Sequence, residues 1–452
     1  LSRPRRFGKS LLMDTLAELF EGNQALFEGL YAQDHWDWSQ RYPVIRISFS
    51  DGVLRSRDEL DQRIRHVLRH NRTALNLPRP PDLPGLTETD VASDFGELIR
   101  QAHAACGQRA VVLVDEYDKP LLDNLLHPDV ALELRDGLRN FYSVIKGADA
   151  HIRFAMLTGV SKFSKVSLFS GLNNLKDITI DERYSAICGY TDAGLDTVFA
   201  AELPGLDRDE VRRWYNGYNW TGESVYNPFD ALLLFDSRQF KPYWFETATP
   251  TFLVDVLKQR HAWLPELGRL QTDADLLSSF DVEHISLEAL MFQAGYLTIG
   301  HVEQRFGEYR YLLRYPNHEV YKSLSNSLLY AWAGPIEHIS KIQRNKKGLG
   351  DVLIANDFAA MQQLFTAFYA SIPHQWYTNN PIAQYEGYYA SVFYAYFAAL
   401  GLDITCEESS NAGRLDMAMK FNGHVYLFEF KVVELAAEGT ALQQIIDKGY
   451  AH

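Results

Sequence analysis

The chain has 452 residues, 46% apolar and 23% charged, which is typical of a folded globular protein of about three domains and excludes a disordered or low-complexity chain. Its net charge of −14 argues against nonspecific coating of nucleic acid, although a local basic groove stays open. Three distant cysteines predict neither zinc nor disulfides, and no uncharged apolar run reaches the ~18 residues of a membrane span, so we expect a cytoplasmic protein.

The first residues carry the second half of a phosphate-binding motif. Gly8-Lys9-Ser10 precedes apolar residues at 12, 16, 19 and 20, whose spacing predicts a helix. A helix that begins there directs backbone N–H groups at an anion, with Lys9 able to reach phosphates and Ser10 able to bind Mg²⁺. Arg3 stands where the full motif has its first glycine. A solvated basic loop of Arg3, Arg5, Arg6 and Lys9 is the alternative.

Three apolar runs predict the strands of a parallel sheet. They cover 44–49, 110–114 and 152–157, and helical stretches such as 57–71 separate them, which is typical of an α/β fold. The second run is continuous, as in a strand buried on both faces.

Polar residues follow two of these strands. Asp115 and Glu116 end the second, where P-loop ATPases have an acid that holds Mg²⁺ and one that polarises the attacking water. Thr158 ends the third and could contact a γ-phosphate. Together with Lys9 and Ser10 these residues predict a nucleotide site that combines the second half of a Walker A motif with a Walker B acid pair. A helix cap after a core strand is the alternative for Asp115-Glu116.

Residues 181–270 are helical and rich in aromatics, which could stack on bases but more simply form the core of a lid. Two stretches, 292–299 and 309–317, resemble a short β unit, and a helical connector follows to about Tyr377. A helix is predicted over 384–400, and Glu386 at its start is a candidate third metal ligand or a solvated residue.

A hairpin is predicted near the C-terminal end of the sequence. Asn422-Gly423 is a favoured two-residue turn, and closing the strands there pairs positions whose numbers sum to 845. One face is then apolar, with pairs such as Met417 and Phe428, while Asp416 falls opposite Glu429 on the other. Like charges so placed destabilise a sheet, and a divalent cation would compensate.

Lys431, two residues past Glu429, would lie on the same face and could orient a water or stabilise developing charge. The pattern therefore favours a metal-dependent phosphodiesterase site, with a solvated face of surface ion pairs as the alternative. In a further helix predicted over 441–450, Gln444 and Lys448 could contact a phosphate backbone or face water.

Taken together, these residues resemble a bacterial and archaeal family that combines an AAA-ATPase-like domain with a C-terminal PD-(D/E)XK nuclease-superfamily domain. The resemblance runs through nearly the whole chain, at residues 1–10, 114–120, 157–165, 171–174, 214–218, 226–229 and 428–431. It implies ATP and Mg²⁺ as cofactors, Arg6, Phe7 and Gly8 as further nucleotide-binding residues, and DNA as a partner, with no membrane and with homo-oligomerisation left open.

The resemblance also implies an α/β fold class: a P-loop NTPase-type parallel sheet with a helical lid, plus a restriction-endonuclease-like α/β domain. We expect a P-loop core at 1–180 without its N-terminal strand, a helical or winged-helix-like lid at 181–275, a β unit and helical connector at 276–375, and a nuclease-like domain, truncated at its C-terminus, at 376–452. The sequence begins with Leu1 and reads as a fragment at both ends.

Three functions stay open on this basis. The first is an ATP hydrolase coupled to a Mg²⁺-dependent endonuclease, with Glu116, Asp416, Glu429 and Lys431 catalytic and Ser10, Asp115, Glu386, Asp416 and Glu429 as metal ligands. The second is a nucleotide-dependent switch whose nuclease-like domain only binds DNA or a partner. The third is an interaction protein with a vestigial P-loop.

Overall fold

The computed structural model describes residues 1–78, 90–161, 168, 174–247, 253–254, 256–257, 267–274, 277, 286–332, 339–369, 386–410 and 413–429. The chain forms two compact units. Unit 1 comprises residues 1–205, 217–236 and 271–312, and unit 2 comprises residues 206–216, 237–270 and 313–452. Each is described below by itself.

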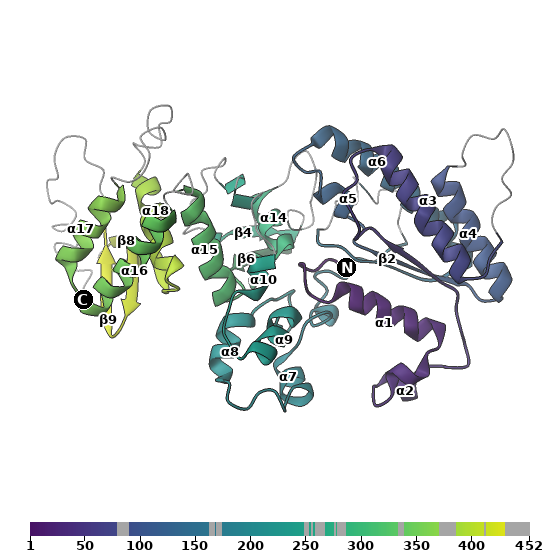
Figure 1. Cartoon of the computed structure of the whole chain (residues 1–452), viewed down its shortest axis with the longest axis horizontal. Coiled ribbons are helices and arrows are strands. Elements are labelled where there is room, and N and C mark those ends of the chain that lie inside the picture. The colour runs from purple at the N-terminus through teal and green to yellow at the C-terminus, as the bar shows by residue number, and fades with distance from the viewer. Residues whose placement is uncertain are drawn as a thin grey trace. The chain divides into compact units, whose positions relative to one another are not determined.

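A parallel sheet forms the centre of unit 1 (Figure 1). Its strands are β1 (Val44–Ser48), β2 (Ala110–Asp115) and β3 (Ile152–Leu157), in that order. All of β2 is buried, as its continuous apolar run predicts. Beyond β3 the chain's first residues add one more parallel pairing, between Ser2 and Gly159. The segment that leads into Gly8 therefore lies beside the strand that leads into Thr158.

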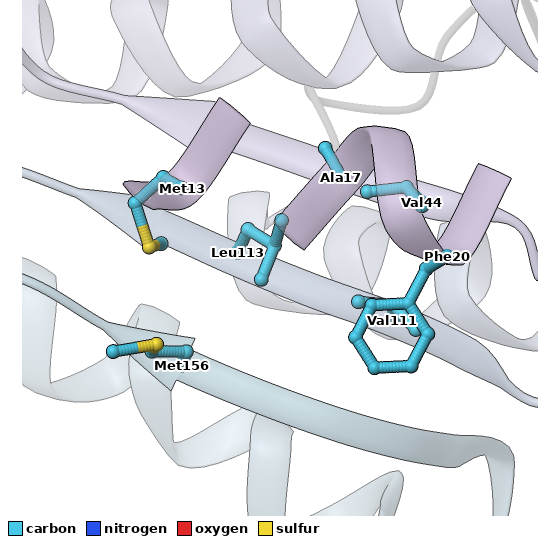
Figure 2. Close-up of a cluster of buried hydrophobic side chains, with 7 residues drawn as sticks. All are labelled: Met13, Ala17, Phe20, Val44, Val111, Leu113 and Met156. Carbon is cyan, nitrogen blue, oxygen red and sulfur yellow. The ribbon is translucent and has the colours of Figure 1, made fainter. Parts of the chain in front are cut away.

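Helices cover both faces of this sheet (Figure 1). On one face α1 (Lys9–Glu21) packs through Met13, Ala17 and Phe20 against Val44, Val111, Leu113 and Met156 of the strands (Figure 2). On the other lie α3 (Arg57–Ala74), α4 (Val91–Cys106) and α6 (Pro128–Gly147). The shorter elements are η1 (Gln24–Phe27), α2 (Ala32–His35), α5 (Lys119–Leu122), η2 (Asp149–His151) and η3 (Glu182–Tyr184).

Short helices and a small antiparallel sheet complete the middle of the chain. The helices of this part of unit 1 are α7 (Asp192–Val198), α9 (Pro228–Ser237) and α14 (Leu287–Ala294). Its strands are β4 (Gln271–Asp273), β5 (Thr298–Arg305) and β6 (Glu308–Arg314), which form an antiparallel sheet in the order β4-β6-β5. The strand predicted over 292–299 begins only at Thr298, because the preceding residues end α14. Several aromatics of this stretch are fully buried, among them Tyr218 and Tyr226, as a core function predicts.

Unit 2 combines helices with a second antiparallel sheet. Its helices are α8 (Arg208–Tyr215), α10 (Tyr243–Thr247), α15 (His318–Trp332), α16 (Ile339–Ala355), α17 (Phe358–Tyr369) and α18 (Glu386–Ala399). The sheet has the order β7-β8-β9, from β7 (Ile404–Ser410), β8 (Gly413–Phe421) and β9 (His424–Phe428). No helix in the described ranges is both long and apolar enough to cross a membrane.

The predicted hairpin register is confirmed in the described part of β8 and β9. Met417 pairs with Phe428 and Met419 with Tyr426. The turn residues Asn422 and Gly423 have φ values of 48° and 78°, the left-handed region that this turn requires. The apolar face packs on α18, where the Phe428 ring lies 4.9 Å from that of Phe393.

Candidate functional site

The P-loop, residues 3–10, lies at the carboxyl edge of the parallel sheet, between the first residues of the chain and the body of α1. Gly8 has a φ of 78°, which glycine adopts without steric cost, and α1 begins at the next residue. Lys9 is buried, and its Nζ donates hydrogen bonds of 3.0 Å to the carbonyl oxygens of both Arg3 and Pro4. The loop therefore closes around its own lysine, which excludes the solvated basic loop for this residue.

Burial lowers the pKa of Lys9, and the nearby carboxylates of Asp118, Asp115 and Glu116 oppose that shift by favouring the charged form. The site is thus a buried cation surrounded by three acids. Arg6 and Phe7 occupy different environments: Arg6 is exposed, whereas Phe7 is fully buried and meets the ring of Tyr218 edge-on at 4.7 Å.

Arg3 is a second buried cation of the loop. Its guanidinium donates to the carbonyl oxygens of Ser2, Thr179 and Tyr184 at 2.8 to 2.9 Å, and it lies 3.9 Å above the ring of Trp220. Burial lowers its pKa to about 10. Arg3 thereby ties the loop to residues 179–184 and to the aromatic segment, so the residue that replaces the glycine anchors the loop.

Asp115, the last residue of β2, joins the P-loop to the end of β3. Its Oδ2 accepts a 2.5 Å hydrogen bond from the Ser10 hydroxyl, and its Oδ1 accepts one of 2.6 Å from the Thr158 hydroxyl. The three residues come from three segments that end at the same edge of the sheet. The structure brings together here the predicted nucleotide residues Lys9, Ser10, Asp115 and Thr158, and Asp115 does not cap a helix.

Glu116 follows Asp115 with a φ of 52°, an uncommon conformation for a residue with a side chain. Burial raises its pKa, and the negative charge of Asp115 adds to this shift. A carboxylate whose pKa is moved toward neutrality is suited to accept a proton.

Asp118 holds the loop that follows β3, a role that sequence patterns did not indicate. Its Oδ2 accepts from the backbone N–H of Val160 at 2.9 Å, and from the N–H and hydroxyl of Ser161 at 2.5 and 2.7 Å. The side chain is 1% exposed, and burial raises its pKa. The one available signal was an acid placed three residues after Asp115.

The C-terminal candidate site lies only partly within the described residues. Glu429 is half-buried and directly follows β9, while Asp416 lies in β8 directly before Met417. Of Asp416 and of Glu386, the first residue of α18, the structure describes the backbone alone. Lys431, Gln444 and Lys448 lie outside the described residues, so their predicted roles stay predictions.

Comparison with known proteins finds a family match for each end of the chain. A family described as "Predicted AAA-ATPase" matches residues 1–169, and one described as "PD-(D/E)XK nuclease superfamily" matches residues 384–452. The chain therefore belongs to the family that joins an AAA-ATPase-like domain to a PD-(D/E)XK nuclease-superfamily domain.

Among curated proteins, it is similar to a protein of Azotobacter chroococcum mcd 1 named "Uncharacterized protein in vnfD 5'region". The two are 63% identical over 451 residues, which cover 100% of this chain and 86% of the relative. No solved structure matches.

Proposed function

We propose that the chain binds and hydrolyses ATP at the P-loop, and that the nucleotide controls a Mg²⁺-dependent nuclease-like domain acting on DNA. The observation that carries the first part is the Asp115 carboxylate, which accepts from Ser10 and Thr158 while the buried Lys9 lies nearby. A loop serine, an acid after a central strand and a hydroxyl after the next strand form the arrangement that P-loop ATPases use.

These residues fit a nucleoside triphosphate with Mg²⁺. The Ser10 hydroxyl and the Asp115 carboxylate are the oxygen ligands that Mg²⁺ prefers, and they lie within 2.5 Å of each other. Bound Mg²⁺ would neutralise charge on the phosphate oxygens. Lys9 would add positive charge at the β/γ-phosphates, Thr158 would contact the γ-phosphate, and Glu116 would take a proton from the attacking water.

The nuclease part of the proposal is supported by the β8–β9 register. The register ends at the pair of Met417 with Phe428, and one more pair in the same register would bring Asp416 opposite Glu429, two like charges that a divalent cation would offset. We infer that these two residues, with Glu386 as a third ligand, hold the metal. Lys431 would stabilise charge that develops on the phosphate, and Gln444 and Lys448 would contact the nucleic-acid backbone.

The test measures ATP binding and the cleavage of plasmid and single-stranded DNA with Mg²⁺ or Mn²⁺, with and without ATP. In Lys9→Ala we expect ATP affinity to fall more than tenfold, because a buried cation of the phosphate site is lost, and cleavage to become independent of ATP. In Glu429→Ala we expect cleavage to vanish and ATP binding to remain. The exposed residues Lys146 and Glu303, each changed to alanine, are matched controls.

Three results would contradict parts of the proposal. Cleavage that persists in Glu429→Ala would remove the assigned metal site. Lys9-dependent ATP binding without cleavage in any condition would favour the nucleotide switch, in which the nuclease-like domain binds without cutting. Failure of the unchanged protein to bind ATP would leave an interaction protein with a vestigial P-loop.

A further inference from the structure

Three cations from three helices gather in unit 2. Lys322 of α15 lies with its Nζ 5.5 Å from the centre of the Trp214 ring of α8, and Arg213 precedes that tryptophan. Lys346 of α16 donates a 2.8 Å hydrogen bond to Asn326, one helical turn beyond Lys322 on α15. We call Arg213, Lys322 and Lys346 the basic cluster.

Mutual repulsion within the basic cluster is not offset by ion pairs to its lysines. Burial lowers the pKa of Lys322, and Arg213 lowers it further; burial and then Lys322 do the same for Lys346. Within the described ranges no carboxylate forms an ion pair with either lysine, and only Arg213 has one, a 3.5 Å contact with Glu210. Holding like charges together costs free energy that a bound anion would recover.

Further cations lie along α16, and the cluster has beside it an aromatic ring and the acid Glu210, whose carboxylate accepts a 2.8 Å hydrogen bond from the Trp214 indole N–H. Exposed Lys341, Arg344 and Lys347 recur every third residue along α16, whose single acid is Asp351. Trp214 is half-buried, and its ring lies close to both Lys322 and His318, which are one turn apart on α15. Burial lowers the pKa of His318 to about 4, Arg213 and Lys322 add to this shift, and the acids Glu210 and Asp403 oppose it.

We propose that the basic cluster binds the phosphodiester backbone of a nucleic acid strand, with Trp214 beside the strand as a stacking platform. Cations spread over three helices suit a chain of phosphates better than one small anion, and basic residues beside aromatics are the usual means of binding single strands. The inference rests on the proposed function in taking nucleic acid as the substrate class, and it assigns where in unit 2 the backbone docks.

The test is fluorescence anisotropy of labelled single- and double-stranded 30-mers over a KCl series, in EDTA and without nucleotide. The unchanged full chain is compared with Lys322→Gln/Lys346→Gln. We expect about tenfold weaker binding and a salt slope lower by about 1 to 2, since each lost phosphate contact lowers it by about 0.7 to 0.9. The variant Lys322→Arg/Lys346→Arg keeps the charge, so its affinity and its salt slope should equal those of the unchanged chain. Thermal unfolding of the glutamine variant is measured as well, and an unchanged midpoint excludes loss of folding as the cause of its weaker binding.

A charge-matched control, Lys146→Gln/Lys176→Gln, removes two exposed lysines of unit 1. Binding by the glutamine variant equal to that of this control would overturn the inference, as would equal competition by polyglutamate, which would indicate an acidic protein partner. The two proposals fail separately. DNA binding that needs the basic cluster but leads to no cleavage contradicts only the nuclease function, whereas cleavage with cluster-independent binding contradicts only this inference.

Discussion

Arg3 stabilises the P-loop of this chain through a side chain that the usual motif lacks. The motif normally has glycine there, and this chain has a large side chain that is 1% exposed. Its charge is met by three carbonyl oxygens and the face of Trp220; among the described residues no carboxylate accepts a hydrogen bond from it, and Asp177 acts on it only through its charge. A guanidinium suits this environment because its planar fork donates in several directions while its face stacks on a ring.

Restoring the consensus glycine should therefore harm the protein. We expect Arg3→Gly to lower the free energy of unfolding by about 3 kcal/mol or more, because three buried carbonyls lose a charged donor at about 1 to 3 kcal/mol each. Urea unfolding measures this. Arg6→Gly is the control, since Arg6 is exposed with a φ of 67° that glycine tolerates, and a change within about 1 kcal/mol is expected. Equal stability of Arg3→Gly and the unchanged chain would show that Arg3 is no anchor.

The convergence of Lys9, Ser10, Asp115 and Thr158 could be anticipated because each follows or begins an element with a clear apolar pattern. Parallel strands bring their carboxyl ends to one edge, so the sequence order suffices. The partners of Arg3 could not be predicted from the sequence, because Thr179 and Tyr184 lie more than 170 residues away in a stretch without regular periodicity. Asp118 was missed because two of its three hydrogen bonds come from backbone N–H groups, which leave no mark in the sequence.

Among the elements, the turn that leaves β3 is tightly packed at Gly159. A Cβ on Gly159 would come within 2.8 Å of both Asp118 Cγ and Tyr117 Cε1, closer than real Cβ contacts. Gly159 also pairs with the loop, because its carbonyl accepts from the N–H of Arg3 at 3.1 Å. The absence of a side chain at this position lets β3, the P-loop and the segment after β2 meet.

Gly159→Ala should displace the turn and break the Thr158–Asp115 hydrogen bond. We expect ATP hydrolysis to fall at least tenfold and stability to fall by about 1 to 3 kcal/mol, the usual cost of overpacking. Coupled-enzyme assays and thermal unfolding check both. Gly147→Ala, at the end of α6, should leave both nearly unchanged, because its added methyl group would meet no atom within 4 Å. Normal turnover in Gly159→Ala would argue against a catalytic part for this turn.

The strands of the C-terminal sheet, β7-β8-β9, differ in how well the sequence predicts them. The β8–β9 hairpin follows from Asn422-Gly423 and the alternation around it, down to the pairing of Met417 with Phe428. In contrast, β7 was not predicted. Its residues, Ile404–Ser410, are mostly polar and lack the apolar alternation that marks a half-buried strand, so only its pairing with β8 defines it.

At the scale of the whole chain, residues that are distant in sequence share a unit. Residues 217–236 and 271–312 belong with the parallel sheet, whereas 206–216 and 237–270 belong with the C-terminal sheet. The predicted domain bounds run consecutively, because composition and periodicity are local signals and carry no information on such interleaving. Those bounds stay predictions.

Two units with separate cores predict ligand-specific stabilisation. We expect calorimetry to show two thermal transitions. ATP with Mg²⁺ at 100 times its Kd should stabilise the unit with the P-loop by about 2.7 kcal/mol. A 30-mer oligonucleotide should raise the other transition instead. Lys9→Ala should lose only the first shift, and Lys322→Gln/Lys346→Gln only the second. One transition that both ligands raise in all variants would contradict the assignment.

The carbonyl hydrogen bonds of Lys9 have a consequence for selectivity. A ligand must offer Lys9 more than the two carbonyl oxygens that it already contacts, and a nucleoside or a monophosphate offers little. A triphosphate brings several charged oxygens at once and can replace both bonds. The closed loop would therefore act as a threshold on phosphate charge: a nucleoside or a monophosphate leaves the lysine on its two carbonyl oxygens, and a polyphosphate displaces it.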